Sequence, residues 1–320
     1  MKLQRNCNSS RAFTLTQLLV VVGIIAILLA FLTPMLNRAR QGSGRVLCAS
    51  NLKQIGLAML MYMNAERDGG FPRTYFDDSG AHPRLDLSDA GFVYNGATAV
   101  NSFTNTNNPS IANLPANSVG GSFFLIFKTQ DLTPDVFICP SSNGTRGFQT
   151  FPVQNSNNFG GWGPGSSANA GKEVIPDVTY SYCNPFFPSD LKVGYKYDDA
   201  TASDFAVAAD VNPGVQTING FTGSPATVNP DDPPAANANG TGQVFGNSSN
   251  HKNYGQHVLY LDGHVEFQTT CWCGSYRPGD SSTVRDNIYT NGTQSTAGGS
   301  FGTDAFPQDK FDSVLLPTSN

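Results

Sequence analysis

A long uncharged segment near the N-terminus constrains this chain more than any other feature. No charged residue occurs between Arg11 and Arg38, and most of the segment is apolar. A helix of about 20 apolar residues is long enough to cross a hydrocarbon core of roughly 30 Å. A short basic leader with Lys2, Arg5 and Arg11 precedes it. The sequence therefore predicts a single helix that attaches the chain to a membrane.

Two ordinary kinds of membrane-targeting segment also begin with a basic leader and an apolar run. A cleaved secretory signal peptide typically has an apolar core of about 7–15 residues that ends in a small-residue cleavage site. Here the run continues to Leu36, and Asn37-Arg38-Ala39-Arg40 follows it without an Ala-Xaa-Ala pattern. These features argue against a secretory signal peptide, and a plain membrane anchor stays an alternative.

The order of residues at the start of the segment indicates a third kind. The run Ala12-Phe13-Thr14-Leu15-Thr16-Gln17 leads directly into the apolar helix. It resembles the leader and first helix of type IV prepilins and type II secretion pseudopilins. The resemblance implies that a prepilin peptidase cuts between Ala12, where the family usually has glycine, and Phe13. Phe13 would then be the N-methylated terminus of the mature chain.

Two further positions can be compared with that family. Pro34 stands where members often have a proline that kinks the helix, because proline removes a backbone donor and clashes with the preceding turn. Gln17 departs from the family, most of which has a glutamate thought to neutralise the terminal amine of a neighbouring subunit. Glutamine accepts a hydrogen bond but supplies no charge, so we expect weaker docking between subunits in lipid.

The apolar pattern continues beyond the predicted membrane segment. Five residues spaced by four, three, four and three positions share one helical face, which is typical of core packing: Cys48, Leu52, Ile55, Met59 and Tyr62. Gly42-Ser43-Gly44 interrupts the pattern and predicts a kink or a fray. Asp68-Gly69-Gly70-Phe71-Pro72 predicts the end of the helix. Residues 51–59 and 69–72 also resemble the second half of this helix, and its exit, in a subgroup of secretion pseudopilins.

The remainder of the chain has the composition of a β-rich domain with long polar loops. Charged residues make up only 13% of the sequence, whereas it contains 33 Gly and 20 Pro. Such a mixture suits a sheet better than a helical bundle. Removal of residues 1–12 takes away three basic residues and changes the formal net charge from −5 to −8. This charge argues against a nucleic-acid partner.

Cysteine usage indicates an oxidising compartment. Of six cysteines, five lie after the leader. Cys139 and Cys183 sit in β-branched or aromatic runs and form a candidate disulfide between strands. Cys271 and Cys273 allow separate bridges, one local bridge or a soft-metal site, but zinc has little support without a second close pair of ligands.

Local patterns predict one more helix and several strands. Ser122 is a candidate N-cap for a short helix over residues 123–128. The content of β-branched and aromatic residues predicts strands at Val136–Cys139, Val178–Tyr182, Phe205–Ala209, Val258–Leu261 and His264–Phe267.

The last two of these strands are joined by the strongest hairpin signal in the chain. Asp262-Gly263 between alternating apolar residues predicts a two-residue type I′ turn. Leu261 would then face His264, and Val258 would face Phe267. Alternation would place one apolar set against the helix, namely Val258, Tyr260, Val265 and Phe267. The opposite face would carry His257, Leu259, Leu261, His264 and Glu266.

Histidine and aspartate residues around the hairpin also allow a metal or catalytic interpretation. His257 would lie roughly 13 Å from His264, at about 3.3 Å per residue, which is too far for one zinc ion. His251 can fold back to Asp262 and brace the turn. We therefore interpret His251, Asp262, Gly263 and His264 as structural residues and expect no metal, with a calcium or other metal site as the alternative. No sequence motif of an enzyme is present, so we expect neither catalysis nor a cofactor.

The same region resembles the C-terminal processing-associated domain of prepilin-like proteins. In that domain a histidine precedes an Asp-Gly pair by nine residues, and here ten residues separate His251 from Asp262-Gly263. Other segments resemble the same subgroup: Phe137-Ile138-Cys139-Pro140, Tyr180-Ser181-Tyr182, Ala208-Ala209-Asp210 and Asp312-Ser313-Val314-Leu315-Leu316-Pro317.

Together these features predict an α+β, pilin-like protein. The expected parts are a leader (1–12), a transmembrane helix segment (13–36), its soluble continuation (37–67) and a β-rich domain (68–320). The resemblance implies a structural or accessory pseudopilin-like subunit, single-pass in the inner membrane with its globular domain in the periplasm or on the cell surface. Its partners would be prepilin peptidase, other pilin-like subunits and membrane lipid. The alternative is a membrane-tethered binding module that uses a pilin-type anchor.

Overall fold

The computed structural model describes nine stretches of the chain: residues 14–65, 70–73, 119–142, 178–186, 203–239, 241–276, 285–292, 306–308 and 311–316. The chain divides into two compact units, Met1–Ser43 and Gly44–Asn320. The predicted cleavage and methylation residues, Ala12 and Phe13, lie outside the described residues. So do residues 66–69, which follow the long helix.

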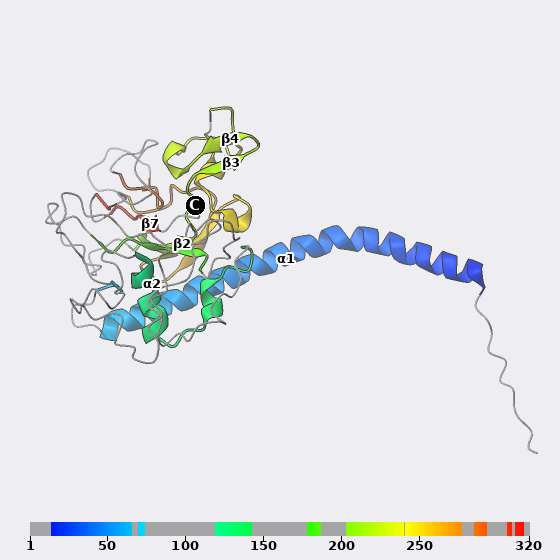
Figure 1. Ribbon diagram of the computed structural model, residues 1–320, viewed down its shortest axis with the longest axis horizontal. Coiled ribbons are helices and arrows are strands. Elements are labelled where there is room, and N and C mark those ends of the chain that lie inside the picture. Colours follow the sequence, from blue (N-terminus) through cyan, green and yellow to red (C-terminus); the bar gives the residue numbers. More distant parts are fainter. Residues whose placement is uncertain are drawn as a thin grey trace, which may run out of the picture. The chain divides into compact units, whose positions relative to one another are not determined.

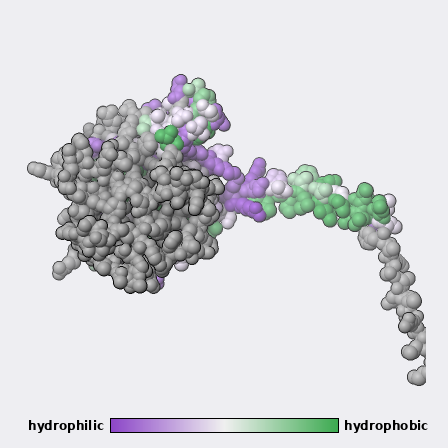
Figure 2. All heavy atoms as spheres, viewed as in Figure 1, coloured by the Kyte–Doolittle hydropathy of each residue, from purple (hydrophilic) through white to green (hydrophobic). Residues whose placement is uncertain are grey.

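One helix, α1, runs from Leu15 to Ala65. It contains an 18-residue window with a mean hydropathy of 2.8 and no buried residue, so its length and composition suit a membrane span. Figure 2 shows apolar residues along the first part of α1, followed by hydrophilic ones. The predicted apolar helix is therefore confirmed.

The N-terminus of α1 is capped by its own side chains. The backbone N–H of Thr14 donates to Oε1 of Gln17 at 3.1 Å, and the N–H of Gln17 donates to Oγ1 of Thr14 at 3.3 Å. This reciprocal pair is a capping box, which satisfies two of the donors that a helix start leaves unpaired. Gln17 thus has a local role that the sequence comparison did not indicate.

Pro34 and Gly42-Ser43-Gly44 do not end the helix, which is continuous through both. The predicted fray at the glycines is therefore wrong. Gly44 is buried, and a Cβ added there would lie only 2.5 Å from Oγ of Ser141. The glycine thus serves close packing rather than a break in the helix.

The second half of α1 buries the face that its spacing predicts. Cys48, Leu52 and Ile55 are fully buried, Met59 is nearly so, and Tyr62 is half-buried. Gly56 lies on the same side, where a Cβ would come within 2.8 Å of Cδ1 of Leu259. A glycine at this position therefore lets the helix backbone approach the sheet closely.

The core of the second unit is a five-stranded antiparallel sheet in the order β6-β5-β2-β1-β7. Figure 1 labels β2 and β7 of this sheet. Its strands are β1 (Tyr180–Cys183), β2 (Ala206–Asp210), β5 (Gln256–Tyr260), β6 (Val265–Gln268) and β7 (Leu315–Leu316). Four of the predicted strands correspond to β1, β2, β5 and β6. A separate two-stranded sheet pairs β3 (Gln216–Ile218) with β4 (Phe221–Gly223). The α+β fold class is therefore confirmed.

The fifth predicted strand, Val136–Cys139, is wrong. Residues Pro134–Phe137 form a 3₁₀-helix, η1, with the proline at its start. Proline suits that position because its fixed φ is already helical. Phe137 then packs edge-on against Phe123 and Phe127, with ring centroids 5.2 and 5.6 Å apart. Aromatic packing thus stabilises the 3₁₀-helix, although the β-branched and aromatic residues of this run favour a strand.

The remaining described helices are short. They are α2 (Val119–Thr129), η6 (Pro225–Thr227), α3 (Gln243–Gly246) and η7 (Ser249–His251). The prediction that Ser122 caps α2 is wrong, because the helix begins three residues earlier and Ser122 is buried inside it.

The β5–β6 hairpin differs from the prediction by one residue of register. His257 pairs with Phe267 and Leu259 with Val265. The N–H of Tyr260 donates to the carbonyl of His264, which leaves a three-residue loop of Leu261-Asp262-Gly263. Gly263 has φ +81°, and no other residue of this loop has a positive φ. A three-residue loop that ends in a left-handed glycine is a common hairpin connection, so the type I′ prediction is wrong.

This slip exchanges the predicted faces of β5, because side chains alternate along a strand, whereas Val265 and Phe267 of β6 keep their predicted place against the helix. Leu259 lies against Gly56 of α1, and the guanidinium of Arg45 lies 4.3 Å from the ring centroid of Phe267. Tyr260 points the other way and donates from its hydroxyl to the carbonyl of Cys273. The helix therefore covers the face that carries His257 and Leu259, together with Val265 and Phe267.

Candidate functional site: a buried cluster of two cysteines, an aspartate and a histidine

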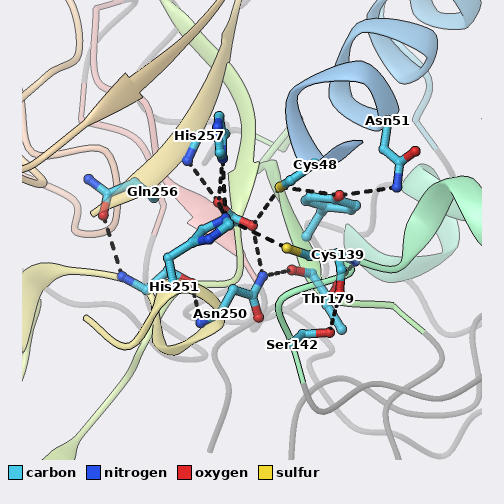
Figure 3. A network of polar contacts seen from close by, with 12 residues as sticks. Cys48, Asn51, Cys139, Ser142, Thr179, Asn250, His251, Gln256 and His257 are labelled. Atoms are coloured by element: carbon cyan, nitrogen blue, oxygen red, sulfur yellow. Dashed lines mark hydrogen bonds and ion pairs between the residues drawn. The ribbon is translucent and has the colours of Figure 1, made fainter. Parts of the chain in front are cut away.

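Four chemically reactive side chains converge between α1 and the sheet, within the second unit. Cys48 lies on α1, Cys139 follows η1, Asp210 ends β2 and His251 ends η7. One sulfur, oxygen or nitrogen atom from each lies within 4.8 Å of the others. All four side chains are buried, and Figure 3 shows the sulfurs of Cys48 and Cys139 directed toward the same point as His251.

Asp210 is the centre of the cluster and is fully buried. Its Oδ1 accepts from Sγ of Cys48 at 3.2 Å and from Nδ2 of Asn250 at 2.8 Å. Its Oδ2 accepts from the backbone N–H of His257 at 2.7 Å and lies 3.1 Å from Nε2 of His251. Burial raises the pKa of Asp210, but hydrogen bonds and charge from the two histidines outweigh burial and hold the pKa well below its usual value. The carboxylate is therefore ionised.

His251 is presented by a tight turn. Ser248 caps η7 by accepting from the N–H of Asn250, and Lys252 ends η7 in a left-handed conformation. Nε2 of His251 lies 3.1 Å from Oδ2 of Asp210, 3.2 Å from Nδ1 of His257 and 3.6 Å from Sγ of Cys139. Burial lowers the pKa of His251, but hydrogen bonds and the charges of Asp210 and Cys139 outweigh it and raise the pKa to about 10.

The two cysteines lie next to each other and have different environments. Burial raises the pKa of Cys48 well above its usual value, and the hydroxyl of Tyr180 donates to its sulfur at 3.4 Å. A hydrogen bond with Cys48 lowers the pKa of Cys139, with burial opposing it and His251 reinforcing it. Cys139 is therefore the more readily ionised thiol of the pair.

A surrounding set of hydrogen bonds holds the cluster in place. The backbone N–H of Cys139 donates to Oγ1 of Thr179 at 2.6 Å. Nδ2 of Asn250 donates to the carbonyl of Thr179 at 2.7 Å in addition to its bond with Asp210. Nδ2 of Asn51 donates to the carbonyl of Ile138 at 3.0 Å, so α1 is tied to the segment that carries Cys139. These contacts hold the backbone of Cys139 against α1 and Thr179, and they hold the carboxylate of Asp210 against Asn250.

The predicted site residues are only partly brought together. His251 lies beside Asp210 and His257 and does not brace Asp262, so that prediction is wrong. Asp262 instead accepts from the backbone N–H and Nδ1 of its near neighbour His264, and both side chains are exposed. Hydrogen bonding to His264 lowers the pKa of Asp262 although its slight burial raises it.

The predicted Cys139–Cys183 disulfide is not formed. Every cysteine among the described residues, including these two, is a thiol. Cys183 follows Tyr182 on β1, and Tyr182 shares a face with Tyr180, so Cys183 points to the opposite face. Cys139 lies instead beside Cys48 and His251. Alternation along β1 thus separates the two sulfurs.

Sequence reasoning missed the chemistry of Cys48, Asp210 and His257. The helical spacing correctly predicts that Cys48 lies on the buried face of α1, but it does not indicate that the thiol contacts a carboxylate. Asp210 ends an alanine-rich strand. A carboxylate in such an apolar run indicates a buried charge that needs a binding partner. Buried carboxylates are nearly always paired, so the sequence already required a cation or several donors near this position.

Comparison with known proteins gives one match. Residues 37–183 match a family model described as "Protein of unknown function (DUF1559)". No curated protein and no solved structure matches the chain. The matched segment contains Cys48 and Cys139 but ends before Asp210 and His251, and it covers less than half of the chain. This segment is therefore similar to a family whose description records no activity.

Proposed function

We propose that the chain is a membrane-anchored, pseudopilin-like subunit of a filament related to type II secretion or type IV pili. The observation that carries this proposal is α1. Its N-terminal part has the length and composition of a membrane span, and its C-terminal part buries one face against an antiparallel sheet. A helix with these two halves is what the resemblance of residues 12–17 to prepilins implies.

The family match neither adds to nor opposes this proposal. It covers residues 37–183, which include the second half of α1 and β1, and the family's description names no function. In this proposal prepilin peptidase removes residues 1–12 and Phe13 is methylated. The globular domain then lies in the periplasm or on the cell surface, and the apolar half of α1 contacts lipid and the helices of other pilin-like subunits.

Gln17 favours a second candidate, a membrane-tethered binding module that does not assemble. Its side-chain oxygen accepts from the N–H of Thr14, and a neutral amide offers no charge to a neighbouring subunit. A module of this kind would keep the pilin-type anchor and use its loops to hold a partner.

The proposal is tested first by mass spectrometry of the full chain extracted from its own membrane. The expected N-terminus is methylated Phe13, and Ala12→Leu should block its formation because the resemblance requires a small residue before the cut. Arg11→Lys is the matched control and should be processed normally. An intact Met1, or a start beyond Leu36, would contradict the proposal.

A second measurement separates the subunit from the binding module. Sheared surface appendages should contain the processed chain if it is a filament subunit. Complete retention of the processed chain in the membrane fraction would reject assembly and leave the tethered module.

A further inference from the structure

We propose that Cys48, Cys139, Asp210 and His251 together bind one zinc ion. The four residues come from four separate elements and are brought to one buried point (Figure 3). Two thiolate sulfurs, an imidazole nitrogen and a carboxylate oxygen are the ligand types that zinc takes in proteins. The inference concerns the stability of the globular domain and is independent of whether the chain enters a filament.

The distances within the cluster fit a tetrahedral centre. Zinc–sulfur and zinc–nitrogen bonds of about 2.3 and 2.0 Å place neighbouring ligand atoms roughly 3.3–3.8 Å apart. Sγ of Cys139 lies 3.6 Å from Nε2 of His251, which in turn lies 3.1 Å from Oδ2 of Asp210. Sγ of Cys48 lies 3.2 Å from Oδ1 of Asp210. The four ligand atoms lie within 4.8 Å of one another, so inward shifts of up to about 1 Å would complete the coordination.

Three polar atoms crowd around one ring nitrogen of His251. Its Nε2 has three polar neighbours within 3.6 Å, namely Asp210, His257 and Cys139. A ring nitrogen carries at most one hydrogen and therefore cannot donate fully to all three. A cation bound to Nε2, Sγ and the carboxylate would attract all of these ligand atoms at once.

The donor set selects zinc over the hard cations. Calcium and magnesium take six or more oxygen ligands, whereas this cluster supplies one carboxylate and two sulfurs. Thiolate and imidazole ligands in a four-coordinate arrangement favour zinc. Four protein ligands also leave no open position for a substrate, so the proposed site is structural rather than catalytic.

Two residues next to the cluster would orient its ligands. Nδ2 of Asn250 donates to Oδ1 of Asp210 at 2.8 Å, and Nδ1 of His257 lies 3.5 Å from Oδ2 of the same carboxylate. Such outer contacts hold a ligating carboxylate in one orientation and typically affect metal affinity about 10–100-fold. Asn250 and His257 are therefore positioning residues in this proposal.

Binding would join distant parts of the domain. The ion would link α1 to the segment after η1, to the end of β2 and to η7. On binding, the thiol protons of Cys48 and Cys139 and the Nε2 proton of His251 pass to solvent, and no electron transfer is involved. Since the unfolded chain does not present these ligands together, the free energy of binding adds to the stability of the folded domain.

The first experiment uses the full wild-type chain in detergent and needs no variant. Metal analysis of the purified protein should find one zinc per chain. After removal by a chelator, addition of zinc chloride should raise the melting temperature. Addition of cobalt(II) chloride should produce the visible and near-ultraviolet absorption of a tetrahedral cobalt–thiolate site.

Variants then assign the ligands. Cys139→Ser and Asp210→Asn should lose the zinc and the cobalt spectrum. Cys183→Ser removes an equally buried thiol outside the cluster and should keep both. His257→Gln should keep the stoichiometry at saturation but weaken zinc binding about 10–100-fold. Far-ultraviolet circular dichroism of each variant checks that the domain is folded.

Three results would overturn the proposal. The first is a wild-type chain that carries no zinc and whose melting temperature does not respond to zinc chloride. The second is bound zinc that survives both ligand substitutions in folded protein. The third is a Cys48–Cys139 disulfide in the chain isolated from its native compartment, detected by peptide mapping under non-reducing conditions, because an oxidised pair cannot ligate the ion.

Discussion

Two glycines at the ends of β5 offer a test of how closely the sheet is packed. Gly255 precedes β5 with φ +152°, and Gly263 follows it with φ +81°. Both conformations are unfavourable for residues with a Cβ, but the surrounding space differs. A Cβ on Gly263 would meet nothing closer than 3.8 Å, whereas a Cβ on Gly255 would lie 2.2 Å from the backbone oxygen of Gln268 and 2.9 Å from the ring of Phe267.

This difference sets the expected costs. Gly263→Ala should reduce the free energy of unfolding by about 1–2 kcal/mol, which is the conformational penalty for an L-residue with positive φ. Gly263→Asn should cost less than Gly263→Ala, because asparagine tolerates the left-handed region. Gly255→Ala adds a clash with backbone that a side-chain rotation cannot relieve. Its total cost should be about 2–5 kcal/mol when overpacking is included.

Urea unfolding of the full chain in detergent, followed by circular dichroism, measures these costs from the midpoints at constant slope. The order of stability should be wild type, Gly263→Asn, Gly263→Ala and then Gly255→Ala. A Gly255→Ala variant as stable as Gly263→Ala would refute the argument that β6 is held against the turn before β5. Equal costs for Gly263→Asn and Gly263→Ala would refute the left-handed conformation of the hairpin loop.

Three further predictions concern the helix and the cluster. Leu52→Ala, in the fully buried face of α1, should cost about 2–5 kcal/mol in the same urea assay, whereas Leu57→Ala on the exposed face should change stability by less than about 0.5 kcal/mol. Gln17→Glu should increase incorporation into sheared filaments, measured by quantitative immunoblotting, and unchanged incorporation would show that the missing charge does not limit assembly. In chelator-treated, metal-free protein the raised pKa of His251 predicts stability that is fully present below about pH 6.5 and declines as the pH rises toward about 10. Urea midpoints across this range should show the decline, and His251→Gln should remove it.

The features that the sequence predicted correctly depend on neighbours along the chain. The apolar segment and the buried face of α1 follow from composition and from a spacing of three and four residues. Both are properties of one helix, whatever it packs against. The strands β1, β2, β5 and β6 are likewise indicated by short runs of β-branched and aromatic residues. The antiparallel α+β fold was therefore accessible from sequence.

The features that were predicted wrongly depend on competition between local preference and packing. Asp262-Gly263 is compatible with both a two-residue and a three-residue loop, and local sequence does not choose between them. Packing chooses the three-residue loop, which brings Leu259 against Gly56. The run after Pro134 becomes η1 because Phe137 joins the aromatic side chains of α2.

By itself the sequence determined a helix that can enter a membrane, its buried second half and a β-rich domain. Only the tertiary structure decided where the reactive side chains meet. Cys48, Cys139, Asp210 and His251 are separated by 41 residues or more along the chain and match no spacing that one loop or helix could present. They converge because α1 passes over the place in the sheet where Asp210 of β2 lies beside His257 of β5. The ends of η1 and η7 bring Cys139 and His251 to the same place. A site made by packing four elements has no short-range signature, since each of its residues obeys the rules of its own element.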